Sequence, residues 1–313
     1  MASALLADLR EGLALPQPTI PPKWFYDERG SELFEAITRL PEYYPTEAER
    51  ALLVANAGAI VGHGSTDTLV ELGAGVSDKT TALLDALLAT DRDAGPTTPI
   101  RRVAFDISAD AIDEGKRRLL DRYPALVTEG VVGDLDRDLH RLPRRGRRLI
   151  ALLGGTIGNY RPAARLALLR SLSGRLGSDD RLLIGMDLVK DPQTLVLAYD
   201  DAAGVTAEFN RNLIRVIARE LAVDLEPAWF DHRAVWNAEA SWIEMHLVAN
   251  RRVEVELADD LALRLDPGEH LLTEVSAKFT IDAARTELAA AGLVAAGLWS
   301  DGRYLLGLWR RAD

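Results

Sequence analysis

The sequence contains no cysteine, and this absence removes several kinds of chemistry at once. Disulfide bonds, thiolate nucleophiles and cysteine-ligated metal sites are all excluded. Histidine is scarce too, with five residues, and no two of them have the i, i+4 spacing of a metal-ligand pair on a helix. We therefore expect no metal site in this protein.

The chain also lacks long apolar runs and an excess of positive charge. No apolar stretch approaches the ~20 residues that span a bilayer, and Asp8, Arg10 and Glu11 interrupt the segment where a signal peptide would have its apolar core. The net charge of −11 disfavours general binding to nucleic acid or to anionic membranes. We expect a cytoplasmic, monomeric protein without a nucleic-acid or membrane partner.

What the sequence does contain is a regular alternation of strand-like and helix-like segments. The strand-like segments are too apolar to be exposed on either face, which indicates a parallel sheet covered by helices, an α/β fold. In such sheets ligands bind beyond the C-terminal ends of the strands. The expected strands are 69–72, 102–106, 127–132, 148–153 and 181–187, and the expected helices are 78–89, 108–121 and 161–176.

Residues 1–60 and 193–277 lack the alternation, whereas the C-terminal tail returns to it. Their expected elements are helices at 46–61, 206–221 and 281–291, with strands at 229–236, 241–250, 252–257 and within 293–310. Thr46-x-x-Glu49 is typical of a capping box at the start of the first of these helices. The predicted domains are residues 61–192 with 278–313 for the α/β domain, and residues 1–60 with 193–277 for a second, substrate-binding lobe.

The first expected strand runs into a glycine turn, Gly73 to Gly75, that leads into a helix. Such a turn lets the backbone approach a nucleotide-type cofactor, and three cofactors compete. Dinucleotide and phosphate-loop motifs both require a glycine where this chain has Asp78. Asp78 therefore disfavours NAD and nucleoside triphosphates, although Lys79 and Thr80 occupy phosphate-loop positions.

The third candidate is S-adenosylmethionine, which carries no phosphate. Its ribose diol suits a carboxylate at the end of the second strand, where Asp106 closes the segment RRVAFD. Asp134 follows the third strand and can accept a hydrogen bond from the adenine amino group. The turn and the two acids, in this order, favour S-adenosylmethionine over the alternative of unrelated surface acids.

Longer sequence blocks extend this interpretation. They are PPKWFYDERGSELFEAITRLPEYYPTEAE, ELGAGVSDKT, LLGGTIGNY, AYDDAAGVTAEFNRN, WIEMHL and LLTEVSAKF. Together they resemble the ergothioneine-pathway L-histidine Nα-methyltransferases, in the family's order and over nearly the whole chain. The resemblance implies a Rossmann-type methyltransferase domain with a substrate lobe, S-adenosylmethionine as cofactor, and three methylations of the L-histidine α-amine that give hercynine (histidine betaine).

The resemblance also implies two sets of contact residues. The donor set is Gly73, Lys79, Asp106, Asp134 and Leu135, the last at a position where related sequences often have an aromatic residue. The histidine set is Asn159 and Tyr199 at the carboxylate, Tyr26 near the amine, Tyr43, Glu274 and Ser276 around the imidazole, and Phe34 and Met245 as apolar walls. No histidine or cysteine dyad offers a strong base, so we expect Tyr26 or water to relay the proton of the amine. In an extended segment Glu274 and Ser276 point to one side, so that a carboxylate and a hydroxyl can bind both imidazole nitrogens.

Two other functions remain open at this point. The first is the same fold methylating another amino acid, such as tryptophan or tyrosine, and the polar pair Glu274 and Ser276 disfavours it. The second is a non-catalytic binding protein that retains the fold. It is disfavoured by the joint presence of four residues, Gly73, Asp106, Asn159 and Tyr199.

Overall fold

A computed structural model describes residues 2–63, 66–75, 79–94 and 99–312 of the chain. The chain forms two compact units. Unit 1 is Met1–Tyr44 with Lys190–Ala277, and unit 2 is Pro45–Val189 with Lys278–Asp313. These limits differ from the predicted domain boundaries, because the helix that follows Tyr44 packs within unit 2 instead of joining the N-terminal segment.

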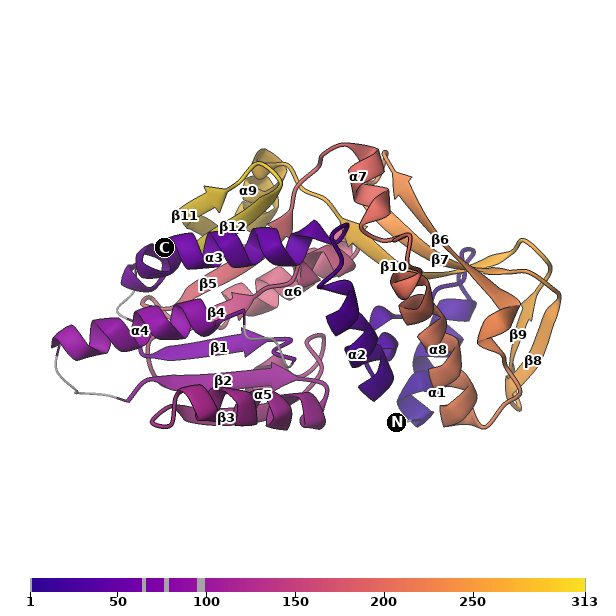
Figure 1. Cartoon of the computed structure of the whole chain (residues 1–313), viewed down its shortest axis with the longest axis horizontal. Helices are drawn as coiled ribbons and strands as arrows, with labels where there is room; N and C mark the ends of the chain where they lie inside the picture. Colours follow the sequence, from indigo (N-terminus) through magenta and orange to yellow (C-terminus); the bar gives the residue numbers. More distant parts are fainter. Residues whose placement is uncertain (1, 64–65, 76–78, 95–98, 313) are drawn as a thin grey trace. The chain divides into compact units, whose positions relative to one another are not determined.

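Within the described part of the chain, unit 2 is built on a seven-stranded sheet of order β11-β12-β5-β4-β1-β2-β3 (Figure 1). The strands are β1 (Thr68–Leu72), β2 (Arg101–Asp106), β3 (Val127–Val132), β4 (Arg148–Leu152), β5 (Arg181–Asp187), β11 (Leu293–Ser300) and β12 (Tyr304–Arg311). Strands β1 to β5 are parallel, and β12 is antiparallel to both of its neighbours. The order reverses between β1 and β4, which is the switch point where α/β sheets bind ligands. The predicted α/β, Rossmann-type fold is confirmed.

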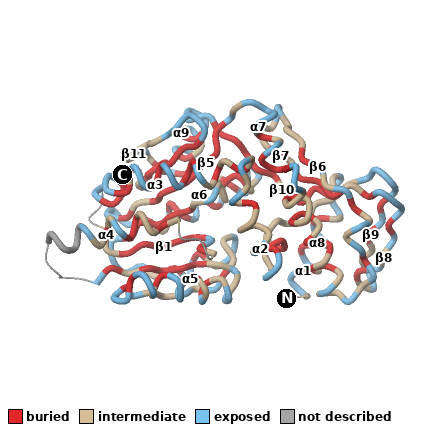
Figure 2. Tube along the Cα trace, in the orientation of Figure 1, coloured by how far each residue is buried: buried red, intermediate tan, exposed pale blue. Residues whose placement is uncertain are grey.

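Helices cover both faces of this sheet. They are α3 (Tyr44–Gly62), α4 (Thr81–Ala94), α5 (Ala109–Arg122), α6 (Pro162–Ser173) and α9 (Ile281–Ala290), with the short 3-10 helices η2 (Leu139–Arg141) and η3 (Thr156–Asn159). Helices α4 and α5 connect β1 to β2 to β3, whereas α6 connects β4 to β5 in the opposite direction. Right-handed crossovers therefore place α6 on the other face. Every residue of β1 and β4 is buried (Figure 2), as strands covered on both faces require.

The capping box predicted at the start of α3 is wrong. The helix begins at Tyr44, before Thr46. The Glu49 carboxylate lies on the inner side of the helix and accepts hydrogen bonds from the Gly154 N–H, in the turn after β4, and from the Tyr304 hydroxyl of β12. A charged group on the buried side of a helix must be satisfied by tertiary partners, because water does not reach it.

Unit 1 packs helices against a three-stranded antiparallel sheet of order β10-β7-β6 in the region that the structure describes. Its elements are α1 (Ala2–Leu13), η1 (Pro22–Phe25), α2 (Glu28–Ile37), α7 (Pro192–Leu197), α8 (Val205–Leu221), η4 (Pro227–Trp229), β6 (Phe230–Asn237), β7 (Trp242–Ala249), β8 (Val253–Ala258), β9 (Leu261–Leu265) and β10 (His270–Ala277). Phe209, Leu213 and Ile217 recur at helical spacing on α8 and share one apolar core with Ile243 and Leu247 of β7.

Among the described residues of the two units, no helix combines the length and the apolar composition needed to cross a bilayer.

Candidate functional site

The glycine turn after β1 lies against the end of β2, as the donor-site prediction requires. The Gly73 N–H donates to the Phe105 carbonyl at 2.8 Å, and the Gly75 N–H donates to Asp106 Oδ2 at 2.9 Å. Gly73 has φ +67°, and a Cβ added there would meet no described atom within 4 Å, so its conformation and not crowding requires glycine. Asp78, on which the argument against phosphate loops depends, lies outside the described residues.

The other predicted donor contacts follow the next strands. Asp106 Oδ1 accepts a hydrogen bond from the Ser108 N–H at 2.9 Å, so backbone amides hold both oxygens of this carboxylate in place. After β3, Asp134 Oδ1 accepts from the Asp136 N–H at 2.9 Å. Leu135 lines a small surface cavity together with Asp136. The ends of β2 and β3 thus present fixed carboxylates, as a ribose diol and an adenine amino group need.

The surroundings of Lys79 favour S-adenosylmethionine as the ligand over a phosphate-bearing one. Its Nζ lies 3.2 Å from Oε2 of Glu49, a carboxylate with no exposed surface. A phosphate loop depends on the full charge of its lysine, whereas here a buried carboxylate balances that charge. Glu49 was missed as a site residue, because its position in the sequence has a local explanation as a helix cap.

Five predicted histidine contacts of unit 1 form one continuous chain of side chains. The ring centroids of Tyr26 and Phe34 are 5.6 Å apart, and those of Phe34 and Tyr43 are 6.2 Å apart. Tyr43 lies 6.1 Å from Tyr199, whose hydroxyl is 2.7 Å from Ser276 Oγ. The two hydroxyls therefore share a hydrogen bond, although the resemblance assigns them to different ends of the substrate.

Glu274 and Met245, two further predicted residues, lie on the paired strands β10 and β7 of unit 1. Glu274 pairs with Met245 across β10 and β7, and Ser276 pairs with Ile243. Glu274 and Ser276 thus point to one side of β10, the side of the buried Met245. Asn159 lies in unit 2, as the last residue of η3 after β4.

The segment that carries Tyr26 is held by a residue that the sequence analysis did not single out. Asn212 Nδ2 donates to the Phe25 carbonyl at 3.3 Å and to Asp27 Oδ1 at 2.7 Å, so both neighbours of Tyr26 are anchored on α8. Asn210 and Asn212 have no exposed surface. Two asparagines on the apolar side of an amphipathic helix are the sequence signal that identifies them, because buried amides need partners.

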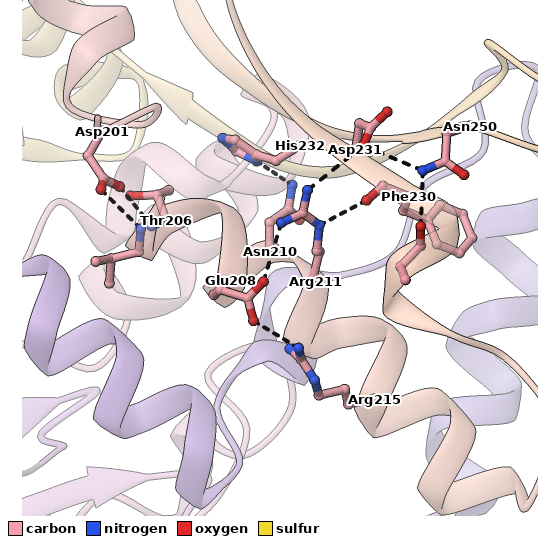
Figure 3. A network of polar contacts seen from close by, with 12 residues as sticks. Asp201, Thr206, Glu208, Asn210, Arg211, Arg215, Phe230, Asp231, His232 and Asn250 are labelled. Carbon is pink, nitrogen blue, oxygen red and sulfur yellow. Dashed lines mark hydrogen bonds and ion pairs between the residues drawn. The ribbon is translucent and has the colours of Figure 1, made fainter. Parts of the chain in front are cut away.

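His232 and Asn210 hold the main chain at Tyr199. His232 Nε2 lies 2.8 Å from the Tyr199 carbonyl, and Nδ1 lies 2.9 Å from Asn210 Nδ2, a contact drawn in Figure 3. A carbonyl only accepts, so Nε2 carries the proton. Asn210 Nδ2 also donates to the His246 carbonyl at 3.1 Å, so it is a donor to Nδ1 and the ring is neutral.

This arrangement predicts a pH-dependent stability. The pKa of His232 is lowered from 6.5, mainly by burial and also by the positive charge of Arg211. The hydrogen bond to the Tyr199 carbonyl and the charges of Asp200 and Asp201 act in the opposite direction but do not outweigh burial. The contribution of the neutral ring is therefore complete above pH 6.5 and is lost as the pH falls toward the lowered pKa of the folded state, at up to about 1.4 kcal/mol per pH unit. Urea unfolding between about pH 5 and 8 should show a smaller slope for His232→Gln, and equal slopes would contradict this account.

Metal ligation has no structural support in the regions described. Among residues 2–63, 66–75, 79–94 and 99–312, no group of three or more histidine, aspartate or glutamate side chains is arranged to hold a metal ion.

Comparison with known proteins identifies the family of this chain. Residues 5–310 match the family model described as histidine-specific methyltransferase, SAM-dependent. The chain is 46% identical over 302 residues to the histidine N-alpha-methyltransferase of Mycolicibacterium smegmatis, covering 96% of this chain and 92% of that protein. It is 28% identical to ergothioneine biosynthesis protein 1 of Schizosaccharomyces pombe over 85% of this chain and 35% of that protein, and 28% identical to the L-tryptophan methyltransferase trpM of Psilocybe serbica over 95% and 89%. The chain belongs to the family of S-adenosylmethionine-dependent, histidine-specific methyltransferases.

Proposed function

We propose that this protein transfers three methyl groups from S-adenosylmethionine to the α-amine of L-histidine and releases hercynine. The observation that carries the proposal is the chain of contacts from Tyr26 to Ser276, with Glu274 on the side of Ser276, because it combines aromatic walls with groups that bind an imidazole. The high identity to a histidine N-alpha-methyltransferase supports the substrate. The similarity to an ergothioneine biosynthesis protein supports the pathway.

The donor contributes a methyl group already activated on a sulfonium. The protein residues then have to bind and orient the amino acid, which can account for about 7–11 kcal/mol of barrier lowering in a near-attack geometry. Glu274 and Ser276 orient the imidazole, and Asn159 and Tyr199 bind the carboxylate. Phe34 and Tyr43 provide aromatic surface that tolerates a trimethylammonium product and attracts it through cation–π contact.

Mass spectrometry of the purified protein with S-adenosylmethionine and each of the twenty amino acids tests the proposal. We expect histidine to gain one, two and then three methyl groups over time, with no comparable product from the other amino acids. The relative that is named a tryptophan methyltransferase makes tryptophan the most informative competitor. If no methylated histidine forms, the proposal is wrong.

Tyr26 is the proposed proton relay, because the amine must lose a proton before each methyl transfer. Its hydroxyl accepts that proton while it passes its own proton to water. Tyr26→Phe keeps the ring contacts with Phe34 and Phe209 but removes the hydroxyl. We expect the rate of each methylation step to fall about 100-fold, as for loss of a general base, with little change in stability. Tyr123→Phe, which removes a hydroxyl bound to Asp85 in unit 2, is the matched control. Unchanged rates for all three steps in Tyr26→Phe would exclude the relay.

A further inference from the structure

Glu49 is a fully buried carboxylate that the proposed function does not use. None of its surface is exposed. Both carboxylate oxygens lie 2.9 Å from the Gly154 nitrogen, which donates to them, and Oε1 also accepts from the Tyr304 hydroxyl at 2.8 Å. Oε2 accepts a charge-assisted hydrogen bond from Lys79 Nζ at 3.2 Å. A buried charge is strongly unfavourable unless it is paired and hydrogen-bonded, and each of these partners meets that need.

The sheet has a glycine, without a side chain, at the place where this carboxylate lies. A Cβ added at Gly185, in the middle of β5, would be 2.0 Å from Glu49 Oε1 and 2.7 Å from the Tyr304 hydroxyl. Gly185 does not have a positive φ, so it is required by this close approach and not by its backbone conformation. Gly185 of β5 and Tyr304 of β12 thus provide the space and a hydrogen bond for the carboxylate of Glu49, which comes from α3.

The carboxylate joins two segments that leave neighbouring strands at the switch point. Lys79 follows the glycine turn after β1, and Gly154 begins the turn after β4 that ends at Asn159. Strands β1 and β4 are paired. A Cβ added at Gly154 would lie 3.6 Å from Lys79 Nζ, so the lysine head lies directly beside this turn.

We propose that Glu49 is a positioning residue that orients Lys79 toward the methyl donor, with Gly154 and Tyr304 as its fixed supports. A lysine side chain is flexible, and an ammonium has three N–H donors. Fixing one donor on a buried carboxylate orients the others, so that the ammonium can bridge Glu49 and the amino-acid carboxylate of S-adenosylmethionine. The inference depends on the proposed role of Lys79 in donor binding and not on histidine as the substrate.

A double-mutant cycle on donor binding tests this inference. Calorimetry would measure the Kd of S-adenosylhomocysteine for the full-length protein, Glu49→Gln, Lys79→Ala and the double variant, with no amino acid present. We expect Glu49→Gln to weaken binding about tenfold, as for a lost charge-assisted hydrogen bond. In the Lys79→Ala background the same change should have less than about a twofold effect, because the residue that Glu49 orients is gone. An unchanged Kd in Glu49→Gln, or an equal effect in both backgrounds, would overturn the inference.

Asp180→Asn is the matched control for loss of a buried negative charge. Asp180 pairs with Arg148 at the opposite, amino-terminal edge of the same sheet. We expect this variant to lower Tm but to bind S-adenosylhomocysteine within about twofold of the wild type, since it leaves the switch point intact. If it weakened binding as much as Glu49→Gln, general destabilisation would explain the effect and the inference would fail.

Tyr304→Phe replaces Glu49→Gln in the cycle if that variant does not fold. It removes one hydrogen bond to Oε1 without changing any charge. We expect a smaller loss of affinity, about threefold, that again disappears in the Lys79→Ala background. An effect that persists there would contradict the inference. Because no amino acid is present, the result does not depend on whether histidine is the substrate.

Discussion

Replacing Glu274 with alanine should reduce kcat/KM for histidine about 100-fold while leaving the affinity for S-adenosylmethionine unchanged. Glu274 lies on the side of β10 that carries Ser276 and faces Met245 across the strand pair. A hydrogen bond to a charged group contributes about 1.5–3 kcal/mol, and its loss leaves an imidazole N–H unpaired. Steady-state kinetics with histidine and calorimetry with S-adenosylmethionine, with no amino acid present, measure the two quantities separately.

The same variant should improve the relative use of tryptophan, because the carboxylate that disfavours an apolar ring is absent. Glu239→Ala is the control, since it makes the same chemical change at an exposed position in the turn between β6 and β7. Unchanged discrimination between histidine and tryptophan in Glu274→Ala would show that the imidazole is bound elsewhere.

Replacing Asp106 with alanine should weaken S-adenosylmethionine binding about 100-fold, or about 3 kcal/mol. Two effects combine in this variant. The carboxylate proposed to bind the ribose diol is lost, and the Gly75 N–H loses its acceptor, so the glycine turn is no longer held against β2. Asp106→Asn retains one acceptor oxygen and should show a smaller loss. Calorimetric titration of the three proteins gives the comparison.

The control for Asp106 is Asp113→Asn, which removes an exposed acidic group from α5. It changes the net charge as Asp106→Asn does, so any long-range electrostatic effect on the donor appears in both. We expect its affinity to be within about twofold of the wild type. An Asp106→Ala variant that bound the donor as well as this control would refute the assignment of Asp106.

Much of the fold was predictable, because its signals are local. The strands of unit 2 are short, apolar and separated by amphipathic helices, and a parallel sheet is the arrangement that buries such strands on both faces. The observed β3 and β5 have the predicted bounds, and β1, β2 and β4 differ from theirs by one residue. The assignment of α3 to the wrong unit has a physical reason. An amphipathic pattern indicates that one side of a helix is buried, but not which core it joins.

The polar residues that support the site could not be predicted in the same way. Asn212 and His232 act on main-chain atoms of Phe25 and Tyr199, which are far away in the sequence. A hydrogen bond to a carbonyl places no requirement on the partner's side chain. The residues around Phe25 and Tyr199 in the sequence therefore do not indicate that these contacts form.

By itself the sequence determined the α/β fold, the donor and the substrate class, because these depend on periodicity and on motifs whose residues are close together or recur as whole blocks. Only the tertiary structure decided which partners Glu49 has and that the hydroxyls of Tyr199 and Ser276 share a hydrogen bond. Glu49 has a plausible local role as a helix cap, and its actual partners, Gly154 in the turn after β4 and Tyr304 in β12, are distant in the sequence. Contacts of this kind form only when the sheet brings distant segments together. The need for a carboxylate at position 49 arises from those segments, so the neighbouring residues in the sequence do not reveal it.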